Sequence, residues 1–444
     1  MGLGAWGSYL YSNPLGGTST PATDLFSLKR NNVILLIIIK YMKVNNKFLS
    51  NIFLRKNSFG ISFPSFINNI LPINSLGIYI HFPFCQKICF YCDFFKTTPF
   101  KYRLYFNNII NEILNSKKYF NEIGYEYFDK IINSIYFGGG TPNLINPFSL
   151  EKILNSIFNN FSLSSECEIT IELNPELITL DYLKSLKYLG INRVSIGVQT
   201  FSLFGLRVLG RTSNPYEIIS KIELVSKFFN NISIDLIYLY PFQKISSLLN
   251  DINTIKNLPI DHISYYALDI YDDKKVIYHR FDTLIKEIHD IQENFNKFYD
   301  LIHYGLRDLG FEHYEVSNFA RNKKYSIHNL KYWYYFDYIG FGPSAVSKLT
   351  LNNNQNKKII RINKKSFDYF IKFSFSNAFY ESIENIEEID DLTAIKEILM
   401  LSLRTKWGIK VKYKNNLYNL KINPLNFKKL NSFINKVYNK LNFF

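Results

Sequence analysis

Short apolar runs alternate with longer amphipathic stretches between residues 77 and 268. Six runs are predicted strands, and most of them have continuous apolar faces, which is typical of strands buried in a parallel sheet. They are Gly77–Ile80, Ser134–Phe137, Glu168–Leu173, Val194–Val198, Ile232–Ile237 and Ile263–Leu268. Helical spacing of apolar residues marks the intervening stretches Leu104–Phe120, Leu150–Phe161, Leu180–Leu189 and Glu217–Phe228. About six strand–helix repeats predict an α/β fold, either a βα barrel or an open doubly wound sheet.

Two of the helical stretches carry boundary signals. Gly190 directly follows the third stretch and is placed as a C-terminal stop. Asn214 is the expected N-cap of the fourth stretch. Pro215 then takes the first helical position and Glu217 the third, which predicts a capping box.

Polar and glycine residues follow the predicted strands in succession. In both architectures the active site lies at the carboxyl ends of the strands. These ends carry Cys85, Cys89, Cys92, Gly138–Pro142, Glu172, Gln199 and Asp235. The glycines allow a ligand to approach the backbone, Glu172 suits ribose hydroxyls, and Arg211 suits a carboxylate. Each residue taken alone also fits a tight turn or a structural ion pair, so the prediction of one shared site rests on the set.

Three of the four cysteines, Cys85, Cys89 and Cys92, lie on one short loop after the first strand. Their C-x3-C-x2-C spacing lets three thiolates converge, one fewer than closes a zinc site or an ordinary iron–sulfur site. A cubane cluster held by three cysteines keeps one iron open for another ligand. The alternative is a zinc site with His81 as the fourth ligand. Disulfides are disfavoured because four cysteines in 444 residues is a low density.

Composition narrows the class of protein. Hydrophobic residues make up 47% of the chain and aromatic residues 17%, which favours a large folded core over disorder. The longest apolar run, Val33–Ile39, is shorter than the roughly 18 residues of a membrane span. The net charge of +15 comes from dispersed lysines without a nucleic-acid motif. We therefore expect a cytoplasmic protein that does not bind nucleic acid.

The two ends of the chain differ from the middle. Residues 1–28 contain no Lys and are rich in Gly, Ser, Thr and Pro, so we expect residues 1–74 to be a dispensable extension, or Met42 to be the functional start. The segment 404–444 carries ten Lys or Arg and no Asp or Glu. It suits contact with an anionic surface such as a membrane. The alternative is a solvated face balanced by the acidic patch at residues 381–391.

Ordered motifs across residues 76–348 resemble one family. They read YIHFPFCQKICFYCDF, YFGGGTP, ITIELNP, GINRVSIGVQTF, LGR, IDLIY, YEVSNFA and HNLKYW. This series resembles the radical S-adenosylmethionine (SAM) family of oxygen-independent coproporphyrinogen III oxidases and their HemW relatives. The resemblance implies a partial (β/α)6 barrel in which Cys85, Cys89 and Cys92 ligate a 4Fe–4S cluster. It also implies that SAM chelates the free iron, and that an external electron donor reduces the cluster.

The resemblance assigns further residues and domains. The positions that match SAM contacts of the family are Tyr79, Tyr91, Gly139, Gly140, Thr141, Glu172, Gln199, Arg211 and Asp235. The implied domains are a barrel at 75–300, a heme- or substrate-binding part at 301–388, and a small basic module at 389–444 with Trp407 in its core. The parts after the barrel form a smaller α+β region.

Two functions within this family differ at Phe94. The coproporphyrinogen III dehydrogenases carry a further cysteine at this position, so Phe94 favours the HemW branch, whose members bind heme and act as heme chaperones for recipient hemoproteins. His328 in the HNLKYW stretch is a candidate to face heme. An aromatic core with a hydrogen-bonded His328 is the equal alternative. The dehydrogenase remains the second interpretation of the chain.

Some residues depart from the family pattern or fall outside it. Leu239 stands where the family has glycine, and Ser344 and Val346 replace parts of its GxGAHS stretch. Cys167 lies far from the cluster loop, and we expect it to be a small buried hydrophobic residue.

Overall fold

The computed structural model describes residues 59–92, 94–97, 102–268, 291–353, 356–370, 378–413 and 416–420. Met42, the rest of residues 1–58, and most of the basic segment at the C-terminus lie outside the described residues. Within the described part of the chain, no helix has both the length and the apolar character needed to cross a membrane.

All six predicted strands are present. They are β2 (Ser75–Phe82), β3 (Ile131–Gly139), β4 (Ser162–Leu173), β5 (Arg193–Gln199), β6 (Ile232–Tyr238) and β7 (His262–Ala267). Each pairs in parallel with the next, so their order in the sheet is their order in the sequence. The predicted βα repeat is therefore confirmed, with the carboxyl ends of the six strands at one edge.

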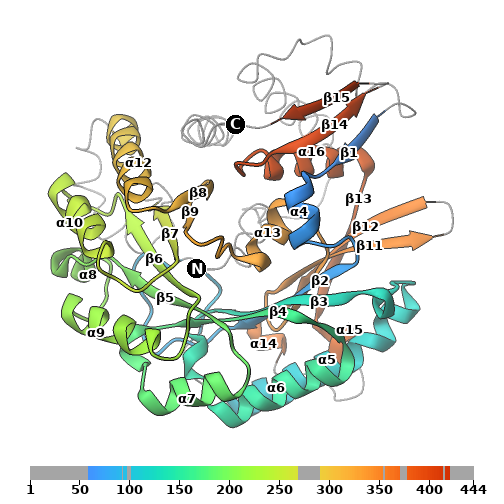
Figure 1. Cartoon of the computed structure of the whole chain (residues 1–444). Helices are drawn as coiled ribbons and strands as arrows, with labels where there is room; N and C mark the ends of the chain where they lie inside the picture. The colour runs from blue at the N-terminus through green and yellow to red at the C-terminus, as the bar shows by residue number, and fades with distance from the viewer. Residues whose placement is uncertain are drawn as a thin grey trace, which may run out of the picture.

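Helices connect and cover these strands (Figure 1). They are α5 (Tyr102–Glu122), α6 (Pro147–Asn160), α7 (Leu180–Tyr188), α8 (Leu203–Val208), α9 (Pro215–Ser226), α10 (Ile245–Ile255) and α12 (Ile291–Asp308). The predicted capping box of α9 is confirmed, because the Asn214 side chain accepts from the N–H of Glu217 and the Glu217 carboxylate accepts from the N–H of Asn214. Gly190 ends α7 in a left-handed conformation with φ 84°.

Additional strands extend both edges of the parallel sheet, which is open. On one side, β10 (Tyr338–Phe341) pairs in parallel with β2, followed by antiparallel β11 (Val346–Asn353), β12 (Asn356–Lys364) and β13 (Ile383–Ile389). On the other side lie β9 (Asn318–Ala320) and β8 (Glu312–Glu315). The described strands thus form a partial (β/α)6 barrel with an α+β extension, as expected. Two acids of the predicted acidic patch pair with this extension, Glu387 with Arg361 and Glu388 with Lys358.

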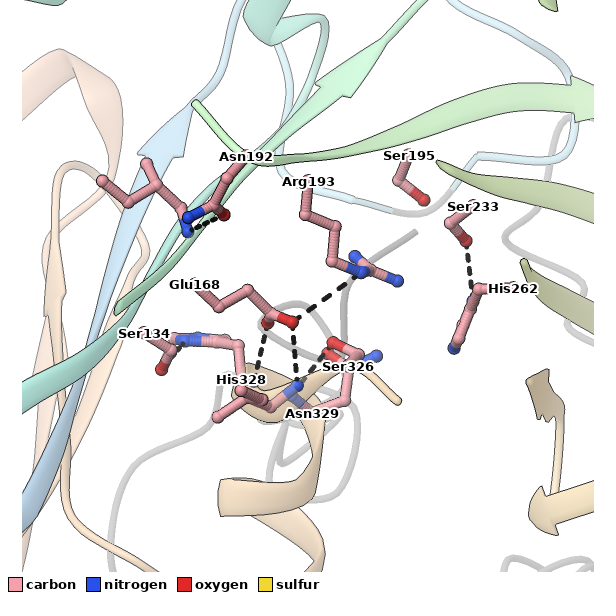
Figure 2. A network of polar contacts seen from close by, with 12 residues as sticks. Ser134, Glu168, Asn192, Arg193, Ser195, Ser233, His262, Ser326, His328 and Asn329 are labelled. Carbon is pink, nitrogen blue, oxygen red and sulfur yellow. Dashed lines mark hydrogen bonds and ion pairs between the residues drawn. The ribbon is translucent and has the colours of Figure 1, made fainter. Parts of the chain in front are cut away.

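The short helix α13 (Ile327–Trp333) packs against the amino-terminal halves of the barrel strands. Figure 2 shows the buried polar network that holds it. The Glu168 carboxylate accepts from the backbone N–H groups of Ile327 at 3.2 Å and His328 at 3.1 Å. The Arg193 guanidinium lies 3.9 Å away on the other side of Glu168. The helix therefore fills the end of the barrel opposite the cysteine loop.

The two ends of the described chain pair with each other. Strand β1 (Phe59–Ser62) is antiparallel to β14 (Ile409–Tyr413), which also pairs with β15 (Asn416–Leu420). Helix α4 (Ser65–Ile70) buries Ile67 in a second core together with residues of α13 and α16 (Asp391–Ser402).

This pairing bears on two expectations. Ile67 and Leu71 are fully buried, so residues 59–74 are part of the packed fold. The Trp407 ring stacks on Phe66 with a centroid distance of 4.9 Å, so it also packs against a residue outside 389–444. Neither feature follows from a local pattern, since Trp407 lies far along the chain from Phe66 and the second core joins Ile67 to residues beyond position 310. The dispensable extension and the separate module stay predictions.

We predict that Ile67→Ala lowers the free energy of unfolding by about 2–5 kcal/mol, because a buried isoleucine leaves a cavity. Ile73→Ala is the matched control, since Ile73 is 90% exposed. Urea unfolding of the two variants checks this. Equal, small losses in both would contradict the packing of α4 into the second core.

Candidate functional site

A cavity of about 240 Å³ lies at the carboxyl ends of the parallel strands. It is lined by eleven of the thirteen predicted site residues: Cys85, Cys89, Tyr91, Cys92, Gly139, Gly140, Thr141, Glu172, Gln199, Arg211 and Asp235. The remaining two, Tyr79 and His328, do not line it. Residues from five consecutive strand ends thus meet in one place, as the strand pattern predicts.

Backbone hydrogen bonds hold the cysteine loop in place. At its neck, the Cys85 N–H donates to the Thr97 carbonyl at 3.0 Å, and the Thr97 N–H donates to the Pro83 carbonyl at 2.7 Å. The Lys96 ammonium donates to the carbonyls of Cys92 and Phe94. The loop is therefore closed on itself.

The kind of metal bound by the three cysteines stays a prediction. Among the described residues, no group of three His, Cys, Asp or Glu side chains is placed to hold one metal ion. Burial raises the pKa of the Cys92 thiol to about 11, so metal binding would have to displace its proton.

His81 is not available as a fourth zinc ligand. Its Nδ1 is hydrogen-bonded with the Tyr79 hydroxyl at 3.0 Å, and its Nε2 with the Phe95 carbonyl at 3.0 Å. Burial lowers the pKa of His81 to about 4, so the ring is neutral. The structure therefore does not support the Cys3His alternative, and His81 instead ties the cysteine loop to β2.

The glycine run packs tightly on the end of β2. A Cβ on Gly140 would lie 2.6 Å from the Phe84 carbonyl oxygen, and one on Gly139 would lie 2.7 Å from the His81 ring. Gly139 also has φ 116°, which side chains rarely adopt. These glycines are thus required for close packing between strands as well as for an open approach to the cavity.

Glu172 is oriented by two donors. The Tyr136 hydroxyl donates to its Oε1 at 3.0 Å, and the Gly139 N–H donates to its Oε2 at 3.2 Å. Tyr79 lies behind this pair, with its ring centroid 6.3 Å from that of Tyr136. Sequence reasoning missed Tyr136, although strand alternation places it on the same face as Gly138 within YFGGGTP.

Two buried polar atoms at the cavity have no protein partner among the described residues. They are Nε of Arg211 and Oε1 of Gln199. The other end of the Arg211 guanidinium is fixed, because Nη2 donates to Asn174 Oδ1 at 2.6 Å and to the Gly197 carbonyl at 3.3 Å. Its Nη1 lies 4.0 Å from the Cys89 sulfur. Orphaned donors and acceptors beside the cysteines fit a polar, carboxylate-bearing ligand such as SAM.

Two acids stabilise the strand ends on the far side of the cavity. Asp235 accepts from the Ser195 hydroxyl at 3.1 Å. Asp251 accepts from the Thr200 hydroxyl and the Phe201 N–H, both at 2.8 Å, which fixes the turn directly after Gln199. Sequence reasoning missed Asp251. An acid on the apolar face of a helix, as in α10, is the signal that marks it.

Two of the residues that depart from the family pattern have a left-handed backbone conformation. Leu239, where the family has glycine, adopts φ 61°, and Ser344 in the GxGAHS stretch adopts φ 57°. Side chains are uncommon in this left-handed region. The backbone shape that glycine favours is thus present at both positions, and Leu239 is held there because its N–H donates to the Gln243 side chain at 2.6 Å.

His328 belongs to the polar network of Figure 2 and does not line the cavity. Its Nδ1 is hydrogen-bonded with the Ser134 hydroxyl at 3.0 Å and its Nε2 with the Tyr332 hydroxyl at 2.9 Å. The side chain is 1% exposed. Because both ring nitrogens are engaged in the core, these contacts favour the alternative of a hydrogen-bonded histidine in an aromatic core. Cys167 is buried, and burial raises the pKa of its thiol to about 12, in keeping with a structural residue.

Comparison with known proteins gives matches over most of the chain. The model of the radical SAM superfamily matches residues 79–255. Heme chaperone HemW of Buchnera aphidicola subsp. Schizaphis graminum is 33% identical, over 66% of this chain and 75% of its own length. Heme chaperone HemW of Lactococcus lactis is 30% identical, over 81% of this chain and 89% of its own.

The fold is also found among solved structures. It is the radical SAM enzyme coproporphyrinogen III oxidase (HemN) from Escherichia coli, with a TM-score of 0.60 and 20% identity over 81% of this chain and 84% of that chain. At this identity the likeness shows the fold alone. The HemW relatives match at higher identity and over most of their own length. The chain belongs to the HemW family within the radical SAM superfamily.

Proposed function

We propose that this protein is a heme chaperone that carries a 4Fe–4S cluster, binds SAM and heme, and delivers heme to hemoproteins. The observation that carries the proposal is the cavity in which three cysteines face the orphaned polar atoms of Arg211 and Gln199. The printed names of the HemW relatives support the heme part. Phe94, at the position of a further cysteine in the dehydrogenases, lines the same cavity.

Membership of the radical SAM superfamily implies a 4Fe–4S cluster and SAM. In our proposal Cys85, Cys89 and Cys92 are the cluster ligands. The cluster, when bound, supplies an open iron and an electron for reductive cleavage of the SAM sulfonium. An electron donor must therefore reach this edge of the barrel.

The protein side chains bind and orient SAM in this proposal. Glu172 accepts from ribose hydroxyls and keeps its orientation through Tyr136. Arg211 pairs with the carboxylate, since Asn174 fixes its other end. The other residues proposed to contact SAM are Tyr91, Gly139, Gly140, Thr141, Gln199 and Asp235, which also line the cavity. Tyr79 does not line the cavity, and in this proposal it supports the Tyr136 ring, on which it packs.

Oxidative decarboxylation of coproporphyrinogen III is the second candidate. The resemblance of the motif series to the oxygen-independent coproporphyrinogen III oxidases keeps it as a candidate. Phe94 disfavours it, because a phenyl ring supplies no thiol. We also propose that the basic C-terminal segment contacts a membrane surface. Most of this segment lies outside the described residues.

The first prediction concerns the cluster. Protein reconstituted without oxygen should contain about four irons and four sulfides per chain. The triple variant Cys85, Cys89, Cys92→Ala should contain almost none, because all three thiolate ligands are lost. Cys167→Ala is the matched control, since this cysteine lies elsewhere in the core. Stoichiometric zinc in place of iron in the unmodified chain would contradict the assignment.

The second prediction concerns SAM. Glu172→Ala and Arg211→Ala should each weaken binding by about 1–3 kcal/mol, because each leaves a ligand group without its partner. Calorimetry on the cluster-loaded protein measures the affinity, and iron content should stay unchanged. Arg307→Ala is the control, since that side chain is 58% exposed and does not line the cavity. Wild-type affinity in both test variants would show that these roles are misplaced.

The third prediction separates chaperone from enzyme. The protein should bind heme and transfer it to apomyoglobin, while coproporphyrinogen III stays unconverted with reductant and SAM present. His328→Ala should leave the heme absorption spectrum unchanged, because both ring nitrogens are engaged inside the barrel. Many turnovers of coproporphyrinogen III, with heme bound no better than by lysozyme, would establish the dehydrogenase instead.

A further inference from the structure

Lys96 is a cation in the wall of the cysteine cavity that sequence reasoning missed. It lies four residues after Cys92, and its side chain is partly buried. Its ammonium donates to the backbone carbonyls of Cys92 and Phe94. Both partners are neutral groups, so these hydrogen bonds fix the position of the positive charge without neutralising it.

No carboxylate pairs with Lys96 among the described residues. The three acids that line the same cavity are engaged with other groups: Glu172 accepts from Tyr136, Asp235 from Ser195, and Glu176 from Thr212. A cation that is partly removed from water without a counterion is unfavourable. Lys96 therefore suits an anion that the cavity gains only when its ligands are bound.

The cysteine thiols are within electrostatic reach of this charge. Burial raises the pKa of Cys85 and of Cys92, and the charge of Lys96 opposes the rise at both. Thiolates, not thiols, are the metal ligands, so binding of a cluster gathers negative charge on this loop. The ammonium of Lys96 thus lies where the occupied site needs a countercharge.

A fixed cation at this place favours reduction of a bound cluster. Reduction adds an electron to the site, and a nearby positive charge stabilises the added negative charge. Net charge, hydrogen bonds and solvent exposure together set the reduction potential of an iron–sulfur cluster. Solvent screens a partly buried charge less than an exposed one. Lys96 therefore has both the position and the burial needed to raise the potential.

We propose that Lys96 is a positioning residue that supplies the countercharge of the cluster and raises its reduction potential. This inference rests on the cluster assignment in the proposed function, and it adds a residue outside the cluster ligands and the SAM contacts. The electron itself comes from the external donor, and Lys96 makes and breaks no bond in the step. Its hydrogen bonds to the carbonyls of Cys92 and Phe94 hold the charge beside the third cysteine.

The test is a redox titration of the reconstituted full chain, followed by electron paramagnetic resonance of the reduced cluster. Lys96→Gln keeps a hydrogen-bond donor for the two carbonyls but carries no charge. It should make the equilibrium constant for reduction about tenfold less favourable, which for one electron is a shift of about 59 mV to lower potential. Lys96→Arg keeps the charge and should have a potential close to that of the unmodified chain.

Lys87→Gln is the matched control. Lys87 lies on the same loop, between Cys85 and Cys89, and lines the same cavity, so this variant removes the same charge. Because Lys87 is exposed, solvent screens its charge and the potential should stay nearly unchanged. A shift as large as that of Lys96→Gln would overturn the assignment to Lys96, because any nearby cation would then have the same effect.

Iron content is measured for every variant, so that loss of the cluster is also informative. Loss of iron in Lys96→Gln but not in Lys96→Arg would support the countercharge. Equal loss in both would overturn it, because the site would then need the shape of lysine and not its charge.

The remaining outcomes separate this inference from the proposed function. If the unmodified chain holds a cluster and Lys96→Gln has the same potential, the inference fails and the proposed function stands. If the unmodified chain binds no iron, the cluster assignment fails, and the role of Lys96 fails with it.

Discussion

The parallel hydrogen-bond ladder from β2 to β7 is the constraint on which the rest of this structure depends. Because each strand pairs with the next in sequence order, all six carboxyl ends emerge at one edge. The cysteine loop, the glycine run, Glu172, Gln199 and Asp235 then converge at this edge, and hydrogen bonds such as that from the Gly139 N–H to Glu172 hold them there. Tight packing also fixes the position of the glycine run, since side chains at Gly139 and Gly140 would clash with the end of β2 and the residues after it.

The opposite end of the barrel depends on buried charge. Glu168 lies between Arg193 and the first N–H groups of α13, and all of these groups are removed from water. Burial raises the pKa of Glu168, while Arg193 and the two N–H donors oppose this rise. A buried ion pair adds little net stability, but loss of one partner is strongly destabilising, typically by about 3–5 kcal/mol. The network therefore orients α13 more than it strengthens the fold, and it accounts for the HNLKYW stretch as a structural element.

The second core brings together the two ends of the described chain. Strand β1 and helix α4 precede the barrel, whereas α16 and β14 follow it, and they meet around Trp407. The parts that flank the barrel in sequence thus form one packed unit.

The sequence by itself determined the elements whose contacts are local or repeated. Periodicity predicted the six strands and four of the covering helices, α5, α6, α7 and α9, and the rule that parallel strands end at one edge predicted the shared site. Only the tertiary structure decided the position of His328, since a histidine in an aromatic motif suits a ligand or a core equally. It also decided the roles of Tyr136 and Asp251 and the integration of residues 59–74. The physical reason is the same in each case: these roles depend on which distant groups share a buried volume, and local spacing carries no information about that.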